Sequence, residues 1–286
     1  MTINDATSSR LIFEDLEINI NELFFEVSDG LKLKVFHLHK INCQNTKKII
    51  FLPGYISTIY SWRHFLPILT NIGDIYYIES REKSSSINNS QNYKINFFVD
   101  DISHTINKLN LKEGDYYLIG SSLGATTILE GLSKGIFCPV NAVLILPNAR
   151  FKIPKFINVL RPFPRTIKIY ITHILIFFAL KLKTNKSDIG QKERFLLATK
   201  NADFDKLIYS AFELSKYKLY FKDLDRIKTK VLIINASEDH LHNVSDIYKI
   251  YRSIKNCQYF DVKSHTNSRN SVAGEVVYDF IQLEHA

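Results

Sequence analysis

The chain alternates short apolar runs with longer segments whose apolar residues recur at helical spacing. Short apolar runs bounded by turn residues are typical of buried strands. Because a helix follows most of these runs, the pattern predicts an α/β fold, with a mostly parallel central sheet flanked by helices. The predicted strands are 48–52, 75–78, 116–119, 142–146, 231–234 and 258–262, and the predicted helices are 96–109, 122–132, 244–254 and 273–283.

The N-terminal part of the chain has a different pattern. Residues 23–27 and 31–38 form two β-rich runs of alternating character, separated by Ser28, Asp29 and Gly30. A short loop that contains glycine between two such runs is typical of a β-hairpin. We therefore expect an antiparallel hairpin ahead of the parallel strands.

The alternation stops between about residues 150 and 224, where prolines and helical periodicity replace the strands. We interpret residues 150–224 as a helical insertion, or cap, on a core formed by residues 1–149 and 225–286. Within it, residues 166–182 are strongly apolar but fall short of the roughly 20 residues that a membrane-spanning helix requires. A buried or substrate-facing helix is the expectation for them.

Gly120, Ser121, Ser122, Leu123 and Gly124 match the pattern G-x-S-x-G at a junction between a predicted strand and a predicted helix. At such a junction a sharp, strained turn presents the serine hydroxyl above the edge of the sheet. Glycine on both sides lets neighbouring backbone approach without a Cβ clash. The pattern indicates a nucleophilic serine, and the alternative is that Ser122 caps the following helix.

A serine nucleophile needs a base, and the chain has nine histidines. His265 follows the predicted strand 258–262, at the sheet edge where open α/β folds bind ligands. Asp239 follows the preceding strand and is the candidate to orient the histidine and stabilise its charged form. Glu238 is an alternative acid. The chain order Ser122, Asp239, His265 is the order known for a triad on such a sheet.

Together these motifs resemble the α/β-hydrolase superfamily over nearly the full length of the chain. The run from Leu52 through Pro53 and Gly54 to Tyr55 resembles the family's oxyanion loop after the third strand. The resemblance implies that the backbone N–H groups of Tyr55 and Leu123 form an oxyanion hole, worth on the order of 3 kcal/mol per donor.

Several residues depart from the family pattern. Pro53 stands where a histidine is common in the oxyanion loop, and Ser121 stands where a histidine often precedes the nucleophile. Residues 79–84 replace a loop of the pattern Asp-x-Arg-Gly-x-Gly and lack its glycines. Asn148 lies where some relatives keep their acid, and an amide cannot serve as one.

The resemblance implies a capped serine hydrolase that acts on a small-molecule acyl ester or thioester. A cap rich in Ile, Leu, Phe and Tyr favours a lipophilic acyl part. Three other functions stay open: acyl transfer or C–C bond hydrolysis on the same triad, a non-catalytic binding protein, and a lipase that contacts membranes through the cap.

The composition and the motifs limit which partners, cofactors and cellular compartment we expect. The net charge of +8 is scattered along the chain, so no nucleic-acid site is predicted. No P-loop or G-x-G-x-x-G pattern occurs, so no cofactor is expected. Residues 238–242 include two histidines but lack metal-ligand spacing, so no metal site is predicted. Three cysteines, an odd number without close spacing, argue against a disulfide framework. Together with the lack of a signal-peptide pattern, they favour a cytoplasmic protein, and the oligomeric state stays open.

Overall fold

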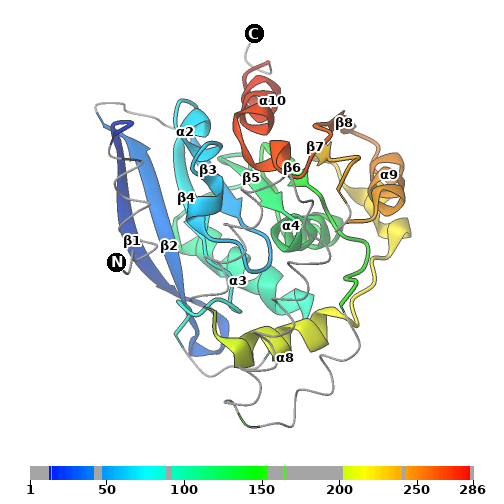
Figure 1. Cartoon of the computed structure of the whole chain (residues 1–286), viewed down its shortest axis with the longest axis horizontal. Coiled ribbons are helices and arrows are strands. Elements are labelled where there is room, and N and C mark those ends of the chain that lie inside the picture. Colours follow the sequence, from blue (N-terminus) through cyan, green and yellow to red (C-terminus); the bar gives the residue numbers. More distant parts are fainter. Residues whose placement is uncertain are drawn as a thin grey trace.

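The computed structural model describes residues 13, 15–41, 47–87, 92–153, 164, 202–239 and 242–283. Eight strands form one sheet in the order β1-β2-β4-β3-β5-β6-β7-β8 (Figure 1). The strands are β1 (Ile18–Glu26), β2 (Lys32–Lys40), β3 (Lys48–Leu52), β4 (Asp74–Ile78), β5 (Tyr116–Ser121), β6 (Asn141–Ile145), β7 (Lys230–Asn235) and β8 (Cys257–Asp261).

The predicted α/β fold and N-terminal hairpin are confirmed. β1 pairs antiparallel with β2 across the turn at Ser28–Gly30, and β2 pairs antiparallel with β4. The strands from β4 and β3 through β8 all pair in parallel. The carboxyl ends of β3, β5, β6, β7 and β8 therefore lie along one edge of the sheet, and the loops that follow them meet there.

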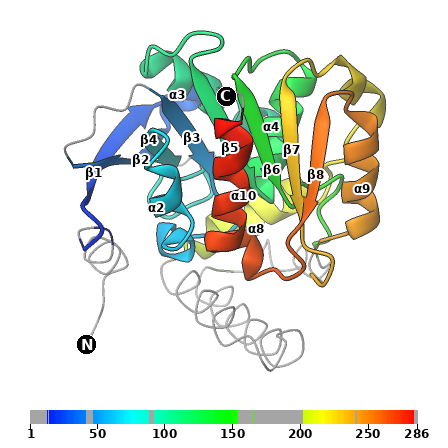
Figure 2. The ribbon, with the colours of Figure 1, turned by 90° about the horizontal axis from the view of Figure 1, so that it is seen from above.

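Both faces of the sheet are covered by helices, which explains why the central strands are apolar throughout. In β5 and β6 every residue is buried. Figure 2 shows α2 and α10 on one face of the sheet, with α3 and α4 on the opposite face. The helices are α2 (Leu66–Leu69), α3 (Ile95–Lys108), α4 (Leu123–Ser133), α8 (Phe204–Leu214), α9 (Val244–Ser253) and α10 (Ser271–Gln282), with 3-10 turns η1 (Ser28–Gly30), η2 (Ile59–Trp62), η3 (Phe221–Arg226) and η4 (Asn267–Arg269).

Most of the predicted cap lies outside the described residues, including the apolar segment 166–182. Its described C-terminal part contains α8, which has a hydrogen-bonding N-cap at Asp203. The side-chain oxygen of Asp203 accepts from the backbone N–H groups of Asp205 and Lys206. In the part of the chain that the structure describes, no helix is long and apolar enough to cross a membrane.

Candidate active site

Ser122 lies in a strained turn between β5 and α4. Its φ of 50° and ψ of −107° place a non-glycine residue in the left-handed half of backbone space. Its backbone N–H donates to the carbonyl of Ile145 at 2.8 Å, which ties the turn to the end of β6. Its side chain makes no capping hydrogen bond to α4, so the structure does not support the alternative that the Ser122 side chain caps this helix.

Three glycines let the backbone close around this serine. A Cβ on Gly124 would lie 2.1 Å from the carbonyl oxygen of Leu52, and one on Gly120 would lie 2.6 Å from the carbonyl carbon of Gly124. A Cβ on Gly54 would approach the Cβ of Ser122 to 3.2 Å. Glycine is thus required where β3, β5 and α4 meet, as the sequence pattern predicts.

His242 is the histidine that contacts both Ser122 and Asp239. Its Nε2 lies 2.9 Å from Ser122 Oγ, and its Nδ1 lies 2.5 Å from Asp239 Oδ2. A carboxylate only accepts hydrogen bonds, so Nδ1–H donates to Asp239 and Nε2 is left to accept from the serine hydroxyl. The three side chains form one continuous hydrogen-bonded chain.

This arrangement corrects the expectation that His265 contacts Ser122. The ring of His265 lies beside that of His242, with the ring centroids 6.5 Å apart and the planes 15° from parallel. His242 has the contact because it follows Asp239 by three residues in the loop after β7, and β7 lies one strand nearer to β5 than β8 does. The sequence shows Asp239 and His242 three residues apart, but this spacing alone does not distinguish His242 from His265.

Asp239 lies where the sequence predicts, in the loop after β7. The side chain of Asp239 is 2% exposed and that of His242 is 9% exposed, so water screens their interaction weakly. Glu238, the alternative acid, is exposed, and its backbone N–H donates to the carbonyl of Lys263 at 2.8 Å. The geometry favours Asp239 over Glu238 as the partner of the imidazole.

Asn148 is a further polar contact of Ser122 that the sequence analysis did not assign to the site. It follows β6, and its Nδ2 donates to Ser122 Oγ at 3.3 Å. Its backbone N–H donates to Thr126 Oγ1 at 3.0 Å, which fixes the residue against α4. The amide cannot act as an acid, but it can donate to a serine oxygen that gains negative charge.

The loop after β3 forms the other wall of the site. The backbone N–H of Ser57 donates to the carbonyl of Gly54 at 3.1 Å, which closes a turn in which Ile56 has a φ of 61°. Positive φ is strained for a β-branched residue and is common at functional sites. Tyr55 Oη donates to the carbonyl of Leu207 at 2.6 Å, and burial raises the pKa of this phenol.

Leu123 is the first residue of α4, so its N–H has no acceptor within the helix. It lies directly after Ser122, as the second donor of the predicted oxyanion hole must. The N-terminal end of α4 also carries a partial positive charge that favours an anion. Tyr55 and Leu123 thus occupy the positions that the resemblance implies, and their role as donors stays a prediction.

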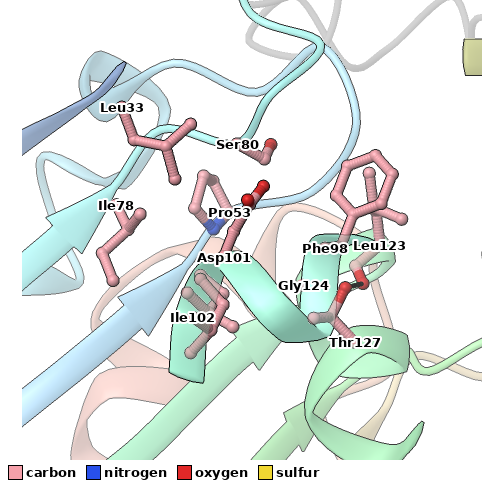
Figure 3. A pocket seen from close by; sticks show the side chains of 11 residues that line it. Leu33, Pro53, Ile78, Ser80, Phe98, Asp101, Ile102, Leu123, Gly124 and Thr127 are labelled. Atoms are coloured by element: carbon pink, nitrogen blue, oxygen red, sulfur yellow. Dashed lines mark hydrogen bonds between the residues drawn. The ribbon is translucent and has the colours of Figure 1, made fainter. Parts of the chain in front are cut away.

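A small void lies behind this site, between the end of β3, α3 and α4 (Figure 3). Its walls are mainly apolar, with Ser80, Asp101 and Thr127 as the polar members, and Ser122 is not among the lining residues. The lining residues are Leu33, Leu52, Pro53, Ile78, Ser80, Phe98, Asp101, Ile102, Leu123, Gly124 and Thr127.

Among the residues that the structure describes, no group of three or more His, Cys, Asp or Glu is placed to hold a metal ion.

Comparison with solved structures identifies the fold. An enol-lactonase from Burkholderia xenovorans has a TM-score of 0.74 and 18% identity, over 91% of this chain and 100% of that one. An esterase from Thermogutta terrifontis has a TM-score of 0.75 and 12% identity, over 93% and 100%. An esterase from Exiguobacterium antarcticum has a TM-score of 0.74 and 14% identity, over 92% and 100%. The chain has the α/β-hydrolase fold.

These similarities are structural. No protein-family model matches the sequence, and no curated protein matches it significantly. The solved structures share the fold of this chain at low sequence identity, and a fold alone does not determine chemistry, which depends on the residues of the site.

Proposed function

We propose that this protein is a serine hydrolase that cleaves an acyl ester or thioester through an acyl-enzyme intermediate. The observation that carries the proposal is the hydrogen-bonded chain from Ser122 Oγ through His242 to Asp239, with distances of 2.9 and 2.5 Å. A serine hydroxyl is a weak nucleophile, and an imidazole held in this tautomer is the group that activates it.

The proposed reaction has two halves. As Ser122 Oγ attacks the carbonyl carbon, His242 Nε2 takes the hydroxyl proton, and Asp239 stabilises the imidazolium that forms. The imidazolium then protonates the leaving alcohol or thiol, and the acyl group stays on Ser122. In the second half, water gives a proton to His242 and attacks the acyl-enzyme, which releases the acid and restores the serine hydroxyl.

The tetrahedral intermediate of each half carries negative charge on the former carbonyl oxygen. The backbone N–H groups of Tyr55 and Leu123 would donate to that oxygen. Asn148 would donate to Ser122 Oγ as the serine oxygen acquires charge. Fixed donors of this kind lower the barrier because they need no reorganisation at the moment of reaction.

The proposed substrate class is an ester or thioester with a hydrophobic acyl part. Structures with this fold and similar coverage include enzymes described as esterases and an enol-lactonase, and a lactone is an internal ester. The apolar composition of the predicted cap supports a lipophilic acyl chain.

A panel of p-nitrophenyl esters with acyl chains from two to twelve carbons tests this proposal. We expect hydrolysis that depends on chain length and is lost in Ser122→Ala. Absence of hydrolysis by the folded protein would contradict the hydrolase function. Equal rates at every chain length would contradict a hydrophobic acyl site and leave the hydrolase function standing.

A further inference from the structure

A lysine with a largely buried side chain lies on the far side of the proposed oxyanion hole. Lys83 Nζ donates to the carbonyl oxygen of Gly54 at 3.1 Å. That oxygen also accepts the backbone N–H of Ser57 at 3.1 Å. The carbonyl of Gly54 and the N–H of Tyr55 belong to one planar peptide unit and point in opposite directions. A contact that fixes the Gly54 carbonyl therefore also fixes the direction of the Tyr55 N–H.

The geometry points to Lys83 as a positioning residue that fixes the Gly54–Tyr55 peptide and strengthens Tyr55 N–H as an oxyanion donor. This inference rests on the proposed hydrolase function. A cation on the carbonyl oxygen polarises the amide, and hydrogen bonds in series through one peptide reinforce each other. Lys83 would thus act on the reaction through a peptide, without touching the substrate.

Lys83 is held in place by a partner that is itself buried. Its Nζ lies 3.4 Å from Glu82 Oε1, and the Glu82 and Lys83 side chains are 0% and 11% exposed. Ser80 Oγ donates to the same Glu82 oxygen at 2.8 Å. Burial lowers the pKa of Lys83, while the carboxylate of Glu82 acts in the opposite direction. Removing an ammonium group from water has a substantial free-energy cost, which the contacts of Lys83 with Glu82 and Gly54 must offset.

The loop that carries Lys83 is anchored on two sides. Arg81 makes a buried bidentate pair with Asp101 of α3, with Nε at 2.7 Å and Nη2 at 2.6 Å from the two carboxylate oxygens. From α8, Lys206 Nζ donates to the carbonyl of Lys83 at 3.2 Å and to that of Ser86 at 2.6 Å. Rigid support is what a positioning residue requires.

The same contacts involve residues 79–84, which depart from the family pattern. Glu82 stands where the pattern has its first glycine, and it pairs with Lys83, whose ammonium group reaches Gly54. The loop is therefore a supporting element of the site.

The test compares Lys83→Met with Lys48→Met as a matched control. Both variants remove a lysine that is mostly shielded from solvent and pairs with a carboxylate, but Lys48 pairs with Asp74 and only Lys83 contacts Gly54. We expect Lys83→Met to lower kcat on a p-nitrophenyl ester about 10-fold, with KM changed less than about 3-fold. It should also weaken binding of an alkylboronic acid, a tetrahedral transition-state analogue, by about 10-fold. Lys48→Met should leave boronate affinity within about 2-fold.

A readout without catalysis separates this inference from the proposed function. Deuterium exchange of the peptide spanning residues 52–57, in the free protein, should be faster in Lys83→Met than in wild type and unchanged in Lys48→Met. If wild type hydrolyses no ester but the exchange result holds, the proposed function fails and the positioning role stands.

Two results would overturn the inference. One is an active wild type with kcat, boronate affinity and exchange all unchanged in Lys83→Met. The other is an equal loss in both variants, which would show general destabilisation. Should Lys83→Met fail to fold, Lys83→Gln keeps a neutral donor and is expected to lower kcat and boronate affinity about 3-fold.

Discussion

Asn148 Nδ2 lies 3.3 Å from Ser122 Oγ, so the proposed nucleophile has an amide donor in addition to its histidine. Replacing Asn148 with alanine removes this donor and should lower kcat about 10-fold, with a smaller effect on KM. Asn148→Asp keeps the shape but replaces the donor with a carboxylate that repels negative charge on Ser122 Oγ, so it should cost more than alanine does. Steady-state kinetics checks this order, and activity equal to wild type in Asn148→Asp would contradict it.

Gly124 is required by packing against β3. A Cβ there would lie 2.1 Å from the carbonyl oxygen of Leu52. We expect Gly124→Ala to lower the free energy of unfolding by more than about 3 kcal/mol, measured by urea denaturation. Gly135→Ala is the matched control, because a Cβ there meets no atom within 4 Å and only its φ of +66° is strained. The control should cost about 1 kcal/mol. Equal costs would show that the approach to Leu52 relaxes without strain.

Burial of Lys83 predicts a dependence of stability on pH. Its pKa in the folded protein is lowered from 10.5, so the folded state binds fewer protons than the unfolded state between the two pKa values. Stability of wild type relative to Lys83→Met should therefore rise as the pH increases from 7.5 to 10. Urea unfolding of both proteins at the two pH values measures the difference. A constant difference would contradict a lowered pKa.

Most of the fold could be predicted because hydrophobic periodicity reports burial directly. The parallel strands at the centre of the sheet are buried on both faces and read as unbroken apolar runs. The structure extends the first strand of the hairpin back to Ile18, which the sequence analysis did not include. The added residues alternate isoleucine with asparagine, and asparagine is disfavoured in strands, so the signal was weak.

Ser122 and Asp239 could be placed because each follows a buried strand. The histidine could not, because His242 and His265 both lie in loops at the same edge of the sheet. Which imidazole turns toward Ser122 depends on the conformation of the loops after β7 and β8, and that conformation leaves no periodic pattern in the sequence. From the sequence, Asn148 was considered only as an acid, a role that an amide cannot fill. Its role as a donor depends on the distance from Nδ2 to Ser122 Oγ, which the sequence does not reveal.

The most direct measurement is labelling with a fluorophosphonate probe, with the adduct located by peptide mass spectrometry. We expect Ser122 to be labelled in wild type, and we expect His242→Ala to slow labelling by at least about 1,000-fold. His265→Ala, whose ring lies beside that of His242 without bridging Ser122 and Asp239, should slow it by less than about 10-fold. Rapid labelling of His242→Ala together with loss of labelling in His265→Ala would contradict the role of His242 and assign the base to His265.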